Sequence, residues 1–180
     1  MLKIILIALV VLVALVLAYA ATKPDTFRVQ RSALVTAPLQ AVSPLISDFH
    51  AWTAWSPWEK LDPALKRTYS GAASGKGAVY AWEGNAKVGK GRMEITDPTT
   101  PSLITIKLDF LKPFEAHNIA EFSLEPQGDA TKVTWAMTGP SPYPAKIMQV
   151  FMSMDSMVGK DFEKGLANLG TAAEEAARRA

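Results

Sequence analysis

The chain has 180 residues, no cysteine and a formal net charge of +2, from 19 Lys and Arg against 17 Asp and Glu. The length fits one domain with a sizeable core. The absence of cysteine excludes disulfides, thiolate metal sites and cysteine nucleophiles. Because the charge is nearly balanced, no strong field attracts a polyanion, and we expect no nucleic-acid partner.

The N-terminus is a hydrophobic segment. From Ile4 to Ala21 it carries no charge over about 18 residues, which at about 1.5 Å per residue nearly crosses a hydrocarbon core of about 30 Å. The tripeptide Ala18-Tyr19-Ala20 also fits the small-x-small pattern that signal peptidase cleaves. Since the run is longer than a typical signal h-region, we expect a retained transmembrane anchor, with secretion after cleavage as the alternative.

This segment sets the expected domain organisation. Residues 1–22 form the anchor or signal segment, 23–26 a linker, and 27–180 one domain, with the membrane as a partner through residues 4–21. If the short, weakly basic N-terminus stays inside the cell, the protein is single-pass and its domain lies on the extracytoplasmic, periplasmic side.

The domain begins with a predicted strand and two short helices. Phe27 to Val35 is rich in residues that suit a strand and ends at Ala37-Pro38. Apolar residues then recur at helical spacing and continue through a second short turn. They are Leu39, Val42, Leu45 and Ile46, followed by Phe49, Trp52 and Trp55.

Strands and one long helix complete the predicted fold. From about Lys66 to Thr138, apolar residues alternate with polar ones between turn signals such as Gly84-Asn85, which indicates antiparallel hairpins with one apolar face. A helical stripe from Ala145 to about Ala177 must cover that face. Gly159 and Gly165 interrupt this helix at about 1 kcal/mol each, so close approach of the sheet or a bend is expected there.

This order of elements resembles the helix-grip fold of the START-like, or SRPBCC, superfamily. Local sequence resembles bacterial members described as polyketide cyclase/dehydrase-like, over about residues 27–173. The stretches that carry the resemblance are Trp52 to Trp58, Asp62-Pro63, Tyr69 to Gly71, Gly77 to Trp82 and Met154 to Leu166. The resemblance implies an α+β fold, with a curved antiparallel sheet wrapped around a long C-terminal helix and a deep apolar cavity between them. Superfamily members include lipid carriers and aromatic cyclases, so fold alone does not fix the activity.

The predicted site is a cavity lined mainly by aromatic side chains, as small-molecule pockets generally are apolar with few polar groups. Methionines suit a wall that repacks around a ligand, and Asn118 is a candidate polar contact. Ordinary core packing is the alternative for each residue. The expected lining is Trp55, Trp58, Tyr80, Trp82, Phe110, Asn118, Phe122, Trp135, Met148, Phe151 and Met152.

Sequence reasoning finds no catalytic residue. His117 belongs to the predicted wet face of the sheet and His50 to a loop, and two such histidines do not make a zinc site, so neither a metal nor a cofactor is expected. We therefore expect a membrane-tethered module that binds a lipid-like or other hydrophobic small molecule.

Two alternatives remain open for the function. A polyketide cyclase/dehydrase-like enzyme would need a titratable group such as His50 or Asp109 in the cavity. A protein-interaction module would show an exposed apolar patch beside Trp52 to Trp58. The basic residues Lys87, Lys90 and Arg92 on one predicted hairpin suit either a solvated strand face or anionic lipid heads.

Overall fold

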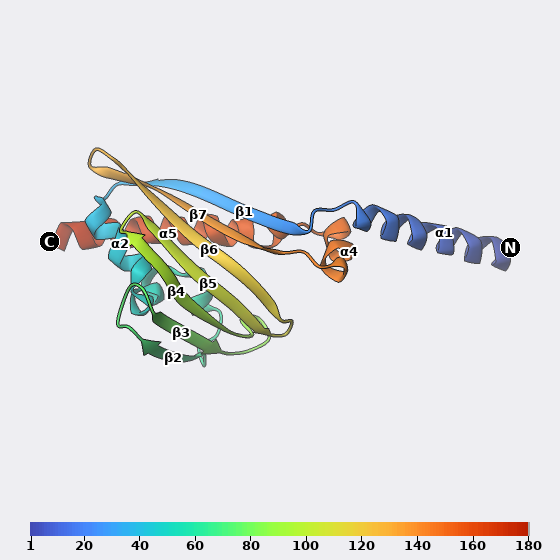
Figure 1. Cartoon of the computed structure of the whole chain (residues 1–180), viewed down its shortest axis with the longest axis horizontal. Helices are drawn as coiled ribbons and strands as arrows, with labels where there is room; N and C mark the ends of the chain where they lie inside the picture. The colour runs from blue at the N-terminus through green and yellow to red at the C-terminus, as the bar shows by residue number, and fades with distance from the viewer. Residues whose placement is uncertain (180) are drawn as a thin grey trace.

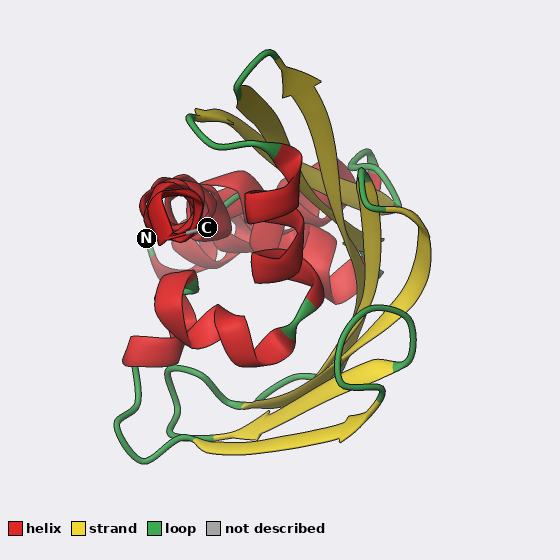
Figure 2. Ribbon diagram, turned by 90° about the vertical axis from the view of Figure 1, so that its left-hand side faces the viewer, coloured by secondary structure: helices red, strands yellow, loops and turns green. Residues whose placement is uncertain are grey.

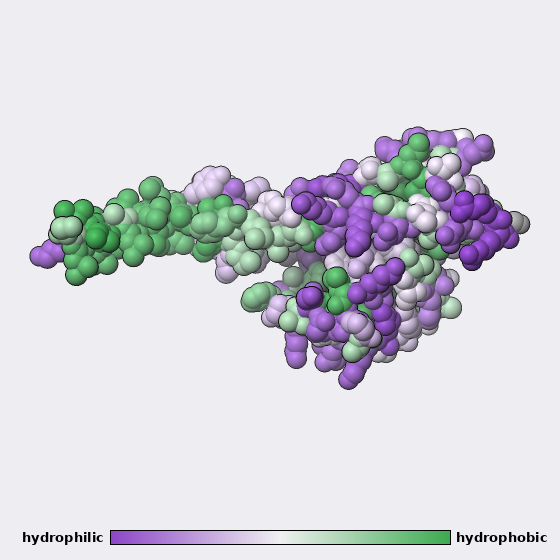
Figure 3. Space-filling model, turned by 180° about the vertical axis from the view of Figure 1, so that it is seen from behind, coloured by the Kyte–Doolittle hydropathy of each residue, from purple (hydrophilic) through white to green (hydrophobic). Residues whose placement is uncertain are grey.

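The computed structural model describes residues 1–179, which form a curved sheet around a long helix, with a separate N-terminal helix (Figure 1). The N-terminal helix α1 (Leu2–Ala21) extends away from the domain, and its side chains are exposed apart from Val16 and Ala20. Among the described helices α1 alone is long and apolar enough to cross a membrane, a test that signal sequences also pass. Figure 3 shows it as a hydrophobic rod beside the more polar domain.

The sheet has seven antiparallel strands in the order β1-β7-β6-β5-β4-β3-β2. The strands are β1 (Thr26–Val35), β2 (Lys66–Gly71), β3 (Ala78–Glu83), β4 (Lys90–Thr100), β5 (Leu103–Lys112), β6 (Ala116–Gln127) and β7 (Ala130–Pro140). Consecutive strands from β2 to β7 are neighbours, as closely spaced hairpins require. The last strand, β7, pairs with the first strand, β1, which forms one edge of the sheet.

Short helices connect β1 to β2 and close one end of the sheet (Figure 2). They are α2 (Leu39–Ser47), η1 (Phe49–Ala51), α3 (Trp52–Trp55) and η2 (Pro57–Lys60). The Asp48 side chain accepts a hydrogen bond from the His50 backbone N–H and so caps η1. The two predicted short helices correspond to α2 and α3, each followed by a 3-10 turn.

The concave face of the sheet is apolar because the side chains alternate with period two. Ile95, Ile106, Ala120 and Met137 lie in register across β4 to β7 and are all buried. The convex face carries the charged residues that alternate with them. The predicted α+β helix-grip fold is therefore confirmed.

Helix α5 (Met154–Arg179) fills the concave face, and its glycines explain how closely it packs. A Cβ atom at Gly159 would lie 2.2 Å from the Arg31 guanidinium, and one at Gly165 would lie 2.8 Å from the Trp135 ring. Arg31 binds both Asp155 and Glu163 at 2.7 Å, which joins edge strand β1 to α5. The close approach expected at both glycines is present.

The C-terminal helical segment is two helices, which corrects the single helix predicted from Ala145 to about Ala177. Helix α4 (Tyr143–Phe151) is followed by Met152, whose backbone is extended, and α5 begins at Met154. Ser153 caps the new helix, since its Oγ accepts from the Ser156 N–H at 3.1 Å. The apolar stripe continues across this break, so periodicity alone does not reveal it.

Candidate ligand cavity

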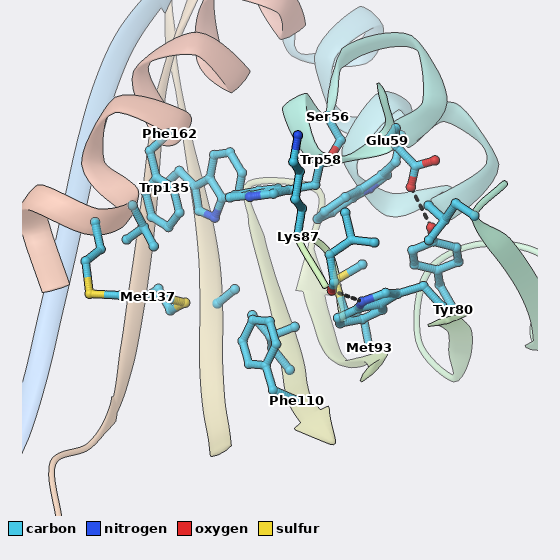
Figure 4. A pocket seen from close by; sticks show the side chains of 18 residues that line it. Ser56, Trp58, Glu59, Tyr80, Lys87, Met93, Phe110, Trp135, Met137 and Phe162 are labelled. Carbon is cyan, nitrogen blue, oxygen red and sulfur yellow. Dashed lines mark hydrogen bonds between the residues drawn. The ribbon is translucent and has the colours of Figure 1, made fainter. Parts of the chain in front are cut away.

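A cavity of about 380 Å³ lies between the sheet, α5 and the short helices (Figure 4). Of the predicted site residues, Trp58, Tyr80, Trp82, Phe110 and Trp135 line it. They come from η2, β3, β5 and β7, so strands on both sides of the sheet centre contribute to one wall. Met93, Leu108, Met137, Val158 and Phe162 add aliphatic, thioether and aromatic surface between them.

The remaining predicted residues lie elsewhere. Trp55 and Phe122 are fully buried beneath the wall, where the Trp55 Nε1 donates to the Leu45 carbonyl at 2.8 Å. Asn118 is 5% exposed and its amide lies over Gly139, where an added Cβ would be 1.9 Å from its oxygen. Neither these three side chains nor their backbones line the cavity.

Met148, Phe151 and Met152 also lie outside the cavity, which corrects their predicted placement. Their exposed fractions are 59%, 75% and 56%. The physical reason is the break between α4 and α5: α4 turns away from the concave face, so the stripe that it shares with α5 in the sequence points outward instead.

Stacked aromatic rings form the inner wall. The rings of Trp135 and Phe162 stack with centroids 4.1 Å apart and planes 4° from parallel. Trp58 meets Trp135 edge to face at 5.6 Å. The Trp135 Nε1 is buried and has no hydrogen-bond partner among the described residues. Such ring contacts contribute about 0.5–1.5 kcal/mol each beyond area burial, so they stabilise this wall of the cavity.

A hydrogen-bonded group of polar side chains, Glu59, Tyr80 and Arg67, borders the cavity. Sequence reasoning did not identify this group. The Glu59 carboxylate accepts a hydrogen bond from the Tyr80 hydroxyl at 2.6 Å and pairs with Arg67 at 2.6 Å. Both Glu59 and Tyr80 line the cavity, and both are at least nine-tenths buried. Burial, reinforced by the bond to Glu59, raises the pKa of Tyr80 well above its usual range. Tyr80 therefore stays protonated and acts as a donor, while its oxygen still has accepting capacity.

Glu59 was missed because a single acidic residue between Trp58 and Lys60 is typical of a solvated turn. Its burial results from the fold, which brings η2 against β3. The only sequence signal was its position directly after the Trp-rich segment Trp52 to Trp58. Val158 and Phe162, by contrast, lie on the helical stripe predicted from the sequence, and the structure adds that they line the cavity.

The cavity opens between the β3–β4 turn and the first turns of α5. Lys87 and Met157, on these two sides, are the exposed side chains among those that line it. The Trp82 Nε1 donates to the Val88 carbonyl at 3.0 Å and so fixes the turn that carries Lys87. The opposite end is closed by buried residues of the short helices, including Trp52 and Ser56.

The mouth lies at the end of the sheet that is nearest α1. Strand pairing places Lys90, at the start of β4, opposite Lys112, at the end of β5. At the same end, Thr26 of β1 lies opposite Pro140 of β7. The chain therefore leaves α1, and enters α4, beside the mouth rather than at the closed end (Figure 1).

His50 and Asp109, the titratable groups that the enzyme alternative would need, do not line the cavity, and neither does His117. The His50 Nδ1 is hydrogen-bonded to the Asp48 Oδ1 at 2.9 Å. The His50 ring stacks on Tyr69 with ring centroids 4.0 Å apart. Asp109 is buried on the convex face, where it binds His117 at 2.7 Å. Burial alone would raise the pKa of Asp109, but hydrogen bonds from His117 and Lys107 lower it overall.

The patch expected of a protein-interaction module beside Trp52 to Trp58 is also not exposed. Trp52 is 4% exposed and Trp55 is fully buried, while Trp58 lines the cavity. The Trp-rich segment thus builds the closed end of the cavity rather than a surface.

Comparison with known proteins identifies the family. Residues 26–174 match the family described as polyketide cyclase / dehydrase and lipid transport. The chain belongs to this family, and the expected membership of the SRPBCC superfamily is confirmed. Among curated proteins none matches the sequence.

Solved structures show the same fold at low identity. An uncharacterised protein from Rhizobium leguminosarum is 13% identical with a TM-score of 0.61, over 84% of this chain and 96% of that one. The Zhui aromatase/cyclase from a Streptomyces species is 15% identical with a TM-score of 0.59, over 83% and 94%. Ara h 8.0201 is 11% identical with a TM-score of 0.54, over 86% and 99%. At these identities the likeness concerns architecture alone.

Proposed function

We propose that the protein is a membrane-tethered binding module whose cavity takes a lipid-like or other hydrophobic small molecule. The observation that carries this proposal is the cavity of about 380 Å³, open at one end, with a largely aromatic and aliphatic lining. Its volume falls within the range of about 300–1,000 Å³ that is usual for small-molecule sites. The family description, which includes lipid transport, supports the same ligand class.

The polar groups of the cavity suggest how such a ligand is oriented. Glu59 and Tyr80 lie toward the closed end, whereas Lys87 lies at the mouth. A ligand hydroxyl can donate to the carboxylate or the phenol oxygen, because each retains accepting capacity. We therefore expect an apolar ligand with a small donor group at its inner end.

The tether rests on α1, which we propose is retained in the membrane with the domain on the extracytoplasmic side. The mass of the mature chain tests the first point, since cleavage after Ala20 would remove all but the last residue of the hydrophobic run. Protease accessibility tests the second point. The domain should be protected in intact cells and should be digested once the outer membrane is permeabilised while the inner membrane stays intact. A shortened chain found free in solution would contradict the tether.

Ligand binding is tested with the fluorescent probe 1-aminoanthracene on the full chain in lipid nanodiscs, through energy transfer from the cavity tryptophans. Ala120 lines the cavity, so Ala120→Phe should fill it and weaken probe binding about tenfold, equivalent to about 1.4 kcal/mol. Val158→Phe, at the helix wall, should act in the same direction.

Thr105→Phe is the matched control, because Thr105 alternates with Ile104 and Ile106 and so lies on the convex face. It adds the same ring without filling the cavity, and probe affinity should not change. Equal affinity in all variants that fold would mean that the probe does not use the cavity, and the binding proposal would fail.

The enzyme alternative retains one supporting observation, which is the presence of Glu59 and Tyr80 in the cavity wall. A cyclase or dehydrase would use such a pair for proton transfer on a bound poly-β-ketone. Cyclised product formed by the wild type and lost in Glu59→Gln would favour the enzyme. Probe binding without any turnover would favour the binding module.

A further inference from the structure

Helix α4 has the reverse of the polarity expected for a helix on a water-soluble domain. Its one buried residue is Lys146, at 8% exposed, while Phe151 is 75% exposed and Met148 59% exposed. Gln149 also turns inward, where its amide donates to the Ser141 hydroxyl at 2.9 Å. A helix in water normally places its apolar stripe against the core and its charges outside. The outer side of α4 is therefore shaped for an apolar surrounding.

Specific contacts hold α4 against the base of α1. The Tyr143 hydroxyl donates to the Leu17 carbonyl at 2.9 Å. Lys146 pairs with Asp25, in the segment that follows α1, at 2.6 Å. The Asp25 carbonyl also accepts from the Ser141 N–H at 2.6 Å, just before α4 begins. These bonds fix α4 beside the point where α1 leaves the domain (Figure 1).

A second exposed apolar segment lies at the same end of the sheet. The β5–β6 turn carries Phe114, which is 76% exposed, next to Leu111, which is 46% exposed. Strand register places this turn beside the β3–β4 turn at the cavity mouth, because Lys90 lies opposite Lys112. Exposed apolar side chains therefore flank the mouth on both sides. A single exposed apolar residue needs no explanation, but a group of them at one end of the domain marks a contact surface.

We propose that α4 lies in the interface of the membrane that α1 crosses, with Met148, Phe151 and Met152 in contact with lipid, so that the cavity mouth faces the bilayer. The inference rests on the proposed retention of α1. A bilayer fits better than a second copy of the chain because the neighbouring α1 is apolar on all sides and exposes Leu15 and Leu17 next to α4. Hydrocarbon is the surrounding that suits both helices, and short amphipathic helices commonly lie at its boundary.

The absence of cysteine allows a direct test, since one introduced Cys takes one fluorophore. Three full-length variants are labelled with NBD and placed in nanodiscs: Leu9→Cys in α1, Phe151→Cys in α4 and Gln127→Cys at the end of β6. All three positions are exposed, so the label should not disturb the fold. Gln127 pairs with Ala130 at the end of the sheet opposite Thr26 and α1, and is the control that should stay in water.

Lipids that carry a doxyl quencher then report contact with the bilayer. The expected result is loss of most emission, with a blue shift, at positions 9 and 151, and no change at 127. Quenching at 9 without quenching at 151 would overturn the inference while leaving the tether intact. No quenching at 9 would remove the tether and the inference together. Energy transfer between labels at 151 on two chains, without lipid quenching, would show that a second copy covers α4 and would also overturn it.

Discussion

Helices α5 and α4 follow one another in the chain, yet they distribute apolar residues in opposite ways. Helix α5 buries Phe162, Leu166 and Leu169 against the sheet. Helix α4 buries Lys146 and exposes Phe151. The difference shows that an apolar stripe identifies a contact face without identifying the contact, which is the protein core for α5 and, we propose, lipid for α4.

The largest expected difference between the helices comes from the same substitution in each. Phe162→Ala removes a ring that is 2% exposed and stacked on Trp135, and should lower the free energy of unfolding by about 3–5 kcal/mol. Phe151→Ala removes a ring that is 75% exposed and should change it by no more than about 0.5 kcal/mol. Urea unfolding in detergent followed by tryptophan fluorescence measures both. Similar losses would show that α4 is part of the core.

Two glycines within α5 sharpen the comparison further. At Gly165 an added Cβ would lie 2.8 Å from Trp135 Cζ3, so Gly165→Ala should displace that buried ring and cost about 1–3 kcal/mol. At Gly170 an added Cβ would lie 3.8 Å from the nearest atom, which is an ordinary contact. Gly170→Ala should therefore stabilise the protein by about 0.4–1 kcal/mol, because Ala has the higher helix propensity and lowers the conformational entropy of the unfolded chain. Thermal unfolding gives both values. A stabilising Gly165→Ala would contradict the close packing of α5 on the cavity wall.

The smallest expected effect concerns acid pH and the attachment of α4. The hydrogen bond from Lys146 lowers the pKa of Asp25 below its ordinary 3.8. The Lys146–Asp25 pair therefore contributes fully to stability above pH 3.8. This stabilisation is lost as the pH falls through the lowered pKa that Asp25 has in the folded protein. A fluorophore on Met148→Cys should gain mobility at that point, as measured by anisotropy.

Two variants decide whether this change belongs to the Asp25 pair. In a Lys146→Met background the acid transition of α4 should disappear, because Asp25 then has no cation to hold. A fluorophore on Lys160→Cys in α5 should show little change, although Arg31 similarly lowers the pKa of Asp155. Buried apolar residues hold α5 in addition to that ion pair. A transition of equal size on both helices would indicate general loosening of the domain.

Much of the fold follows from the sequence because its signals are local. Alternation such as Ile104, Ile106 and Leu108, with turn residues between strands, indicates a hairpin sheet with one apolar face. The helical stripe through Phe162 and Leu169 indicates the helix that covers that face. Neither signal depends on contacts between distant residues.

The site was harder to predict because the tertiary structure, rather than any local sequence pattern, decides which residues line the cavity. Trp58 and Trp135 line the cavity while Trp55 is buried beneath it, although all three are large aromatics in apolar patterns. Glu59 becomes a buried cavity residue only when Arg67 and Tyr80 reach it from β2 and β3. Met148 and Phe151 were misplaced because the Ser153 cap, two residues after α4, redirects the chain.

The most direct test of the binding proposal is the identity of what the cavity holds. The full chain is purified from membranes, transferred to nanodiscs, and analysed by native mass spectrometry and solvent extraction, with Ala120→Phe and Thr105→Phe treated in parallel. The account predicts an apolar molecule bound to the wild type and to Thr105→Phe, and clearly less of it bound to Ala120→Phe. An empty wild-type chain, or the same molecule in equal amount on a folded Ala120→Phe, would contradict it.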